Sequence, residues 1–107
     1  MIARIWHGYT SKSGAAIYED LLKEEIFAGI EQKNIKGYKG IQLLRRDFGD
    51  ETEFTTIMWF DTIQSVKQFA GDNYEEAYVP AKAREVLLRF DAKSIHCELR
   101  HNLQYDF

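Results

Sequence analysis

Two histidines in strand-like segments are the side chains best suited to acid–base chemistry in this sequence. His7 lies in an N-terminal run of apolar and aromatic residues and His96 in a similar run near the other end, whereas His101 belongs to the C-terminal end. A neutral imidazole accepts a proton from an acidic phenol or C–H group near neutral pH. The resulting carbanion could react directly with O₂, without a metal or flavin. The alternative is that each histidine only hydrogen-bonds a strand edge or a partner subunit, and His96 has a ready partner in its same-face neighbour Glu98.

Aromatic residues are the candidates for contacts with a bound molecule. Trp6 and Trp59 could form the walls of a cavity for an aromatic ligand, or they could pack in the core or at an interface. Tyr74 and Tyr78 flank an irregular segment that could close over such a cavity, with their hydroxyls orienting a substrate. Phe69, on the apolar stripe of a helix expected over residues 61–71, is a further candidate for substrate binding.

Spacings that hold metals or phosphates are missing. Three histidines and one cysteine are scattered without an H-x-x-H or C-x-x-C pair, so no metal site is expected. No glycine cluster opens a helix, so no phosphate-binding loop is expected either. Arg45 and Arg46 fall beside a predicted hairpin, where a solvated or dimer-contact role is more common than anion binding.

Composition and charge point to an ordinary intracellular domain. The net charge of −3 and the sequence pI of 5.6 argue against a nucleic-acid partner. The single cysteine, Cys97, cannot form an internal disulfide, which fits a reducing compartment. The sequence begins directly with an alternating pattern and has no apolar run of membrane-spanning length, so we expect a cytoplasmic protein without membrane contact.

The elements that must position these residues form a simple series in a chain of 107 residues, which is one domain over 1–107. Strands are expected at 2–9, 40–46, 53–60 and 93–103, and helices at 14–32 and 61–71, with 47–51 as a turn and 73–91 as an irregular segment with one or two helical turns. A capping-box spacing at 61–64 and Gly71 delimit the second helix. The order β-α-β-β-α-β predicts an α+β, ferredoxin-like split βαβ fold, with both helices on one face of a four-stranded antiparallel sheet.

The third expected strand is apolar on both of its faces. Phe54, Met58 and Phe60 share one face, and Ile57 and Trp59 share the other. Two helices cover only one face, and exposing the second would cost several kcal/mol at about 25 cal/mol per Å² of apolar surface. A second copy packed sheet to sheet would cover it, so we expect a homodimer. The alternative is a monomer in which segment 73–91 folds over the open face.

Several short motifs together resemble one known family. They are IARIWHG at 2–8, LRR at 44–46, EF at 53–54, FAGD at 69–72, and His96 in the last strand. The chain resembles the antibiotic-biosynthesis-monooxygenase domain, of the dimeric α+β-barrel superfamily, over almost its whole length. The resemblance implies two such domains paired as a barrel.

The same resemblance implies a site and an activity. Members with known chemistry hold their substrate in an apolar cavity between sheet and helices, and use a polar residue of the first strand and a Trp of the third. Trp59 is the match for the Trp; His7 or Trp6 falls near the first position, but the Asn of several such enzymes is absent. Haem-degrading members also need a His on the second helix, and residues 61–71 contain none, so haem degradation is not expected.

Two functions therefore remain open at the level of sequence. The first is a cofactor-independent monooxygenase acting on a small hydrophobic or aromatic compound; it predicts a closed cavity lined by Trp59, with a histidine pointing inward. The second is a non-catalytic dimer that binds a small apolar molecule or serves as a structural module. It predicts a cavity filled by Phe and Leu side chains, with both histidines facing solvent.

Overall fold

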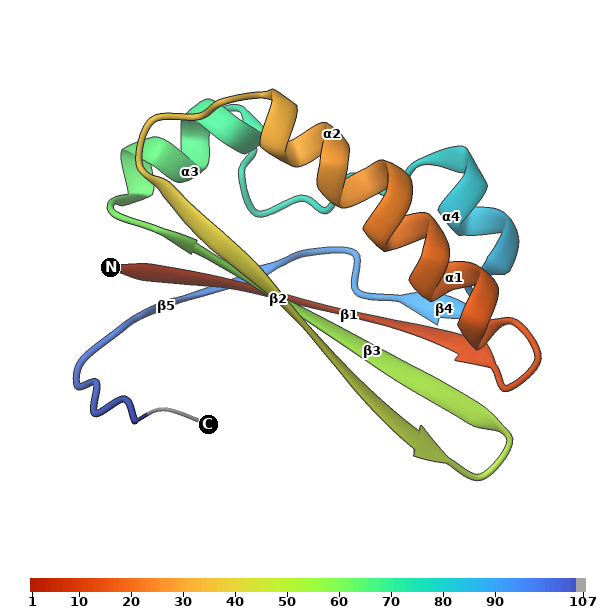
Figure 1. Cartoon of the computed structure of the whole chain (residues 1–107). Coiled ribbons are helices and arrows are strands. Elements are labelled where there is room, and N and C mark those ends of the chain that lie inside the picture. Colours follow the sequence, from red (N-terminus) through yellow and green to blue (C-terminus); the bar gives the residue numbers. More distant parts are fainter. Residues whose placement is uncertain (106–107) are drawn as a thin grey trace.

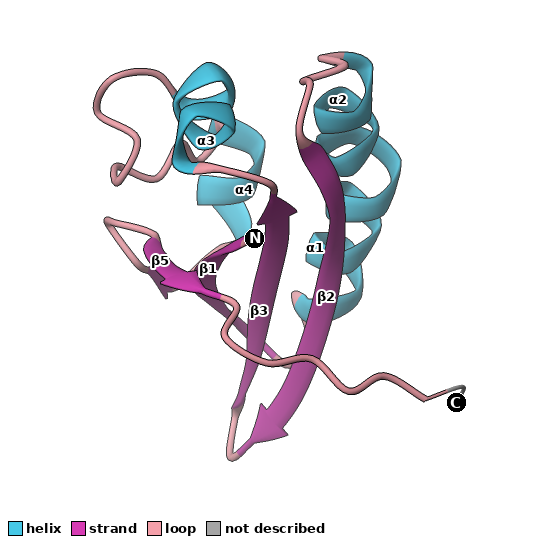
Figure 2. Ribbon diagram, turned by 90° about the vertical axis from the view of Figure 1, so that its left-hand side faces the viewer, coloured by secondary structure: helices cyan, strands magenta, loops and turns pink. Residues whose placement is uncertain are grey.

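A single antiparallel sheet carries all of its helices on one face (Figure 1, Figure 2). The computed structural model describes residues 1–105. Its strands are β1 (Ile2–Ser11), β2 (Tyr38–Phe48), β3 (Glu51–Phe60), β4 (Arg89–Phe90) and β5 (Ile95–Glu98). Its helices are α1 (Ala15–Leu21), the π turn η1 (Leu22–Ile26), α2 (Phe27–Gln32), α3 (Ile63–Ala70) and α4 (Ala81–Val86). The fold is the predicted α+β, ferredoxin-like type, with α4 added before the last strands.

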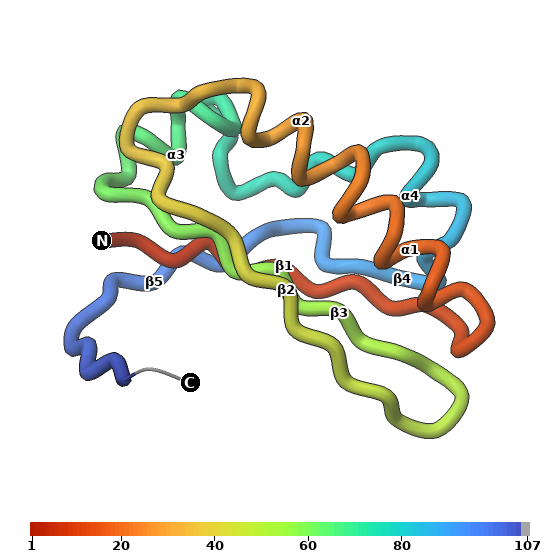
Figure 3. Tube along the Cα trace, viewed as in Figure 1, coloured from red at the N-terminus to blue at the C-terminus, as the bar shows by residue number. Residues whose placement is uncertain are grey.

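The sheet has the order β2-β3-β1, and both β4 and β5 pair with the remaining edge of β1. Gly8 of β1 pairs with Phe90 of β4, and Ile2 with Glu98 of β5. Figure 3 shows β4 and β5 following one another along β1. The short strand β4 lies in the 73–91 segment that was expected to be irregular, so it is an addition to the predicted sheet. The strand predicted over 93–103 is confirmed only over 95–98. The Leu99 N–H still donates to the Met1 carbonyl, but the ladder between β1 and β5 ends at the pair of Ile2 and Glu98.

The first long helix is continuous from Ala15 to Gln32 and has a π turn in its middle. The predicted helix over 14–32 is thereby confirmed. The second helix, α3, is capped by Thr62, whose Oγ1 accepts a hydrogen bond from the Ser65 N–H at 3.3 Å, and it ends at Gly71 with φ 90°. None of the helices in the described chain has the length and apolar character that a membrane span requires.

The core lies between the helices and the even-numbered face of β3. Phe54, Met58 and Phe60 are buried there, as their shared face predicted, and the Tyr18 ring meets the Phe54 ring edge-on at 5.1 Å. Val79 of the 73–91 segment packs into the same cluster. That segment therefore covers the helical side of the sheet, and the alternative in which it covers the open face is wrong.

The opposite face of the sheet carries apolar side chains that nothing in the described chain covers. Ile57 and Trp59 are half-buried among their strand neighbours, whereas Leu44 and Ile95 keep 53% and 56% of their surface exposed. We call this the open face. It is apolar, as the sequence predicted.

Candidate functional site

A cavity of about 800 Å³ lies between the sheet and the helices. Its floor is formed by Arg4 and Trp6 of β1 and by Thr56 and Met58 of β3, and its other walls come from the long helix, the end of α3 and the 76–83 segment. Cavities of roughly 300–1,000 Å³ hold small organic ligands in proteins. The space is therefore large enough for a compound of a few fused rings.

Most of the cavity wall is apolar or aromatic. These residues are Trp6, Leu21, Leu22, Ile26, Phe27, Ile30, Ile41, Met58, Phe69, Val79 and Ala83. Four of the charged lining residues are exposed and mark the mouth, namely Glu25, Lys33, Glu76 and Lys82, whereas Arg4 is buried. The cavity is open there, in contrast to the closed cavity expected for an enzyme. The binding-module alternative expected a cavity filled by Phe and Leu side chains. The cavity is not filled in this way, because about 800 Å³ of it is free.

Trp6 is held in the cavity wall by contacts on two sides. Its indole Nε1–H donates to the Asp91 carbonyl at 2.8 Å, and its ring packs against Phe90 at 6.1 Å between centroids. Gly8 makes room for the indole, since a Cβ there would lie 2.7 Å from the Trp6 ring. Trp6 thus lies in the cavity wall, which is one of the two positions that the sequence left open.

Tyr18 brings a phenol to the same cavity. Its side chain is buried and its burial raises the pKa of the phenol, so the hydroxyl stays protonated. Its hydroxyl makes no hydrogen bond to another described residue. The hydrogen bonds of Tyr18 are those of its backbone in the helix. It is thus a donor at the wall that remains for a ligand.

Arg4 is the cation of the cavity floor and is only 7% exposed. Its Nη1 donates to the Tyr74 carbonyl and to His96 Nε2 at 3.0 Å, and its Nη2 lies 3.4 Å from the Glu76 carbonyl. Phe69 lies beside the guanidinium, 5.8 Å from its central carbon to the ring centroid. Burial lowers the pKa of Arg4 from its ordinary value, but an arginine starts so high that it stays charged.

His96 supports Arg4 from behind. Because a guanidinium only donates, His96 Nε2 must accept, and the imidazole in this contact is neutral. Burial and the nearby positive charge of Arg4 both lower the pKa of His96. The Tyr74 ring packs edge-on against the imidazole at 5.1 Å. His96 is not part of the cavity lining, so it can act on a bound molecule only through Arg4.

His7 lies on the open face, away from His96. Arg4 pairs with His96 across β1 and β5, and His7 follows Arg4 by three residues, so its side chain points to the other side of the sheet. There Asp91 Oδ2 accepts from the His7 N–H at 3.0 Å and from Nδ1 at 2.7 Å. Because the first and last strands of a split βαβ sheet are neighbours, the sequence allowed the two imidazoles to lie near one another. That expectation is wrong, because strand alternation places them on opposite faces of the sheet.

Trp59 also lies on the open face. Its indole Nε1–H donates to Gln42 Oε1 at 3.1 Å, and it takes no part in the cavity. The cavity side of β3 is its even-numbered side, which includes Thr56, Met58 and Phe60. The prediction that Trp59 lines the cavity is therefore wrong, because Trp59 is an odd-numbered residue of β3 and its side chain lies on the face opposite the cavity.

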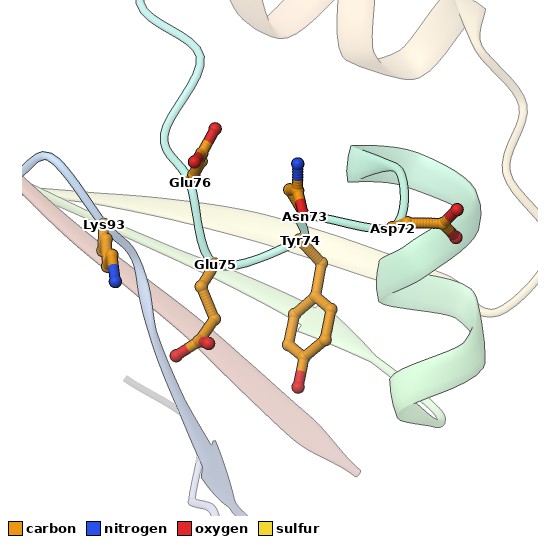
Figure 4. Close-up of a pocket in the computed structure, with 6 residues that line it drawn as sticks. All are labelled: Asp72, Asn73, Tyr74, Glu75, Glu76 and Lys93. Carbon is orange, nitrogen blue, oxygen red and sulfur yellow. The ribbon is translucent and has the colours of Figure 1, made fainter.

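The three remaining candidates lie in or near the cavity. Phe69 lines it, and Tyr78 stands at its mouth with 87% of its surface exposed. Tyr74 lies next to it and contributes its carbonyl to Arg4. Its side chain lines a separate polar pocket of about 170 Å³ with Asp72, Asn73, Glu75, Glu76 and Lys93 (Figure 4). In this view Tyr74 and Glu75 point to one side of the segment and Asn73 and Glu76 to the other.

Arg4 and Tyr18 are the site residues that the sequence did not identify. Arg4 shares its strand face with Trp6, and a charged residue on a core-facing position is rare unless it has a function or a partner. Arg4 could therefore have been identified as a candidate site residue from the sequence. Tyr18 lies on the apolar stripe of the first helix, where an aromatic residue is not distinguished from the core.

Comparisons with known structures agree on the fold. Chains of about the same length match with low sequence identity. A protein of the antibiotic-biosynthesis-monooxygenase type from Bacillus cereus has a TM-score of 0.68 at 11% identity, over 98% of both chains. A monooxygenase from Streptomyces coelicolor, solved with nanaomycin D, has 0.62 at 12% identity, over 98% of this chain and 92% of its own.

A haem degrader from Mycobacterium tuberculosis, solved with two haems in its active site, has a TM-score of 0.59 at 17% identity, over 97% of this chain and all of its own. No protein-family model matches the chain, and no curated protein is significantly similar to it in sequence. The chain thus has the antibiotic-biosynthesis-monooxygenase-type fold, which confirms the resemblance indicated by its motifs at the level of the fold.

Proposed function

We propose that this protein binds a small hydrophobic or aromatic compound in the cavity between sheet and helices, and oxygenates it without a cofactor. The observation that carries the proposal is the cavity itself, with about 800 Å³ of space and a mostly apolar wall that includes Trp6, Phe27 and Phe69. Structures of the same fold that hold nanaomycin D or haem support the binding of a flat, ring-rich molecule.

The chemistry can be written for an anthrone-type substrate. Loss of a proton from the ring CH₂ gives an enolate, which passes electrons directly to O₂. The CH₂ carbon becomes a carbonyl, and the second oxygen atom leaves as water with the two hydrogens of that carbon. The substrate itself supplies the electrons, so no metal or flavin enters the balance. Arg4 would stabilise the enolate oxygen, and Tyr18 is a further donor in the wall.

The active form proposed here is a homodimer joined at the open face. Ile57, Leu44 and Ile95 give that face an apolar surface that the described chain leaves uncovered. His7 and Trp59 lie on the same face and would be part of the dimer contact. Their predicted catalytic role is replaced in this proposal by a role in assembly.

One observation favours a second candidate, a binding module without catalysis. Neither histidine lines the cavity, so no imidazole is placed to take a proton directly from a bound substrate. In this alternative the same cavity holds the same class of compound and releases it unchanged.

Oxygen uptake on a panel of anthrone and quinol compounds tests the first candidate. We expect consumption of O₂ and formation of a carbonyl product with the unmodified chain, and a loss of at least about tenfold with Gly29→Trp, a loss that corresponds to about 1.4 kcal/mol of transition-state stabilisation. Gly29 lines the cavity on α2, and a Cβ there meets nothing within 4 Å, so a Trp can enter the space without a backbone clash.

Ala16→Trp is the matched control, because Ala16 is exposed on α1 and does not line the cavity. It should leave oxygen uptake unchanged. Binding of the panel without uptake would favour the second candidate, and absence of both binding and uptake would refute the cavity as the site.

A further inference from the structure

The guanidinium of Arg4 is buried and has no carboxylate partner among the described residues. Arg84 also lacks a carboxylate, but it is exposed and donates to the Val79 carbonyl. Arg45, Arg46, Arg89 and Arg100 each form an ion pair with a carboxylate at the surface. Arg4 is 7% exposed, and no described carboxylate lies within ion-pair distance of it. A charge removed from water is costly unless a counter-charge or hydrogen bonds replace the water. The fold thus keeps a buried cation without supplying its anion.

The hydrogen bonds of Arg4 leave one edge of the guanidinium free. A guanidinium has five N–H donors. Both Nη1 donors are engaged, by the Tyr74 carbonyl and His96 Nε2, and one Nη2 donor points to the Glu76 carbonyl at a long 3.4 Å. Nε–H and the second Nη2–H have no acceptor among residues 1–105. The side edge of the fork, formed by Nε–H and the Nη2–H next to it, fits two oxygens of a carboxylate.

The free edge can be reached from the cavity. Arg4 is part of the cavity floor, and no fully enclosed polar side-chain atom in the described chain lacks a partner. Nε has no hydrogen-bond partner among the described residues, so this atom is not fully enclosed and borders space that water or a ligand can enter. The surrounding wall is apolar, with Phe69 beside the guanidinium, so an ion pair there is less screened than one at the surface.

We infer that the cavity selects an aromatic compound with an acidic oxygen, and that Arg4 binds this oxygen as an anion through its Nε–H and Nη2–H edge. The inference rests on the proposed function, because it concerns the same cavity. It adds the chemical class of the ligand: an apolar ring system with a carboxylate or an ionised phenol. His96 and the Tyr74 carbonyl are positioning groups, since they fix Nη1 and thereby orient the free edge.

Calorimetric binding of three probes with one ring system tests this inference: 2-naphthoate, neutral 2-naphthamide, and 2-naphthol. With the unmodified chain we expect 2-naphthoate to bind about tenfold or more tightly than 2-naphthamide. A charge-assisted hydrogen bond usually changes the binding affinity by about this factor. Bound 2-naphthol is followed by its absorption near pH 7. A spectrum of the naphtholate would assign the site to ionised phenols, and a carboxylate preference alone would assign it to carboxylates.

Two variants of Arg4 and one control complete the test. Arg4→Met should reduce the preference for 2-naphthoate to less than about twofold while 2-naphthamide binds as before. Arg4→Lys keeps the charge without the fork and should retain part of the preference, which also serves if the Met variant does not fold. Arg45→Met removes a positive charge outside the cavity and should leave all affinities unchanged.

The outcomes separate this inference from the function on which it rests. Equal binding of 2-naphthoate and 2-naphthamide, with no naphtholate spectrum, would refute the anion site but leave the aromatic cavity standing. A preference that persists in Arg4→Met would refute the role of Arg4. If none of the three probes binds, both the anion site and the proposed cavity function are wrong.

Discussion

Trp59 and Phe60 are neighbours in the sequence but lie on opposite sides of the sheet. Alternation along β3 predicted that Phe54, Met58 and Phe60 share a face and that Trp59 lies on the other, and both are confirmed. What alternation alone does not give is which face the helices cover. The even-numbered face of β3 carries three large apolar residues and no charge, whereas Glu53 lies on the odd-numbered face. Trp59 could therefore have been assigned to the open side on physical grounds.

Arg4 shows the opposite situation. Its place beside Trp6 on one strand face followed from the sequence, but its partners did not. The contact with His96 depends on the register between β1 and β5, and the contact with the Tyr74 carbonyl depends on an irregular segment about seventy residues away. Contacts of this kind arise only from tertiary structure, so the cation site could not be read from motifs.

The close approach of Gly8 to the Trp6 ring gives a prediction at the scale of one methyl group. Gly8→Ala should lower the free energy of unfolding by about 1–3 kcal/mol, because the new Cβ would lie 2.7 Å from the indole. It should also weaken binding of aromatic ligands, since the indole must move within the cavity wall. Chemical denaturation and calorimetry measure the two effects.

Gly29→Ala is the matched control for that substitution. Gly29 lies within α2, and nothing lies within 4 Å of a Cβ added there. Alanine should stabilise the helix by up to about 1 kcal/mol. Equal stability of the two variants would show that the Gly8 position is not constrained as the structure indicates.

Among the elements, those with strong local signals were predicted best. The first helix, the β2–β3 hairpin and α3 all follow from periodicity, turn residues and a cap. The π turn of η1 was not predicted, because the spacing of Leu22, Ile26 and Ile30 also fits an uninterrupted α-helix. Yet its Leu22, Glu25 and Ile26 line the cavity, and such turns inside α-helices are frequent at functional sites.

The last strand was predicted too long because a strand needs a partner as well as a pattern. Alternation continues past Glu98, but β1 begins at Ile2 and pairs no further. Between β4 and β5, Asp91 turns its carboxylate to the His7 N–H and interrupts the ladder. The irregular segment before it contains α4, which begins after Pro80, as a proline at a helix start favours.

At the scale of the whole molecule, the two faces of the sheet have different roles in the proposal. The helical face encloses the cavity, and the open face carries the apolar surface for a second copy. The prediction of apolar side chains on both faces of β3 was the sequence observation behind this division. The dimer itself stays a prediction.

Sedimentation of the chain at micromolar concentration tests the dimer. We expect a species of twice the 12.5 kDa monomer mass. Leu44→Lys should shift it to the monomer, because a charge would be placed on the open face at a residue with 53% of its surface exposed. Ile17→Lys, at an α1 residue with 62% exposed, should leave the dimer intact. A stable monomer of the unmodified chain would refute the proposed assembly.

A crystal structure of the chain grown with 2-naphthoate tests the central claim most directly. We predict the rings between the sheet and the long helix, against Trp6 and Phe69, with the carboxylate facing the side edge of Arg4. A ligand bound on the open face beside Trp59, or an empty cavity in crystals of a chain that binds the compound in solution, would contradict it.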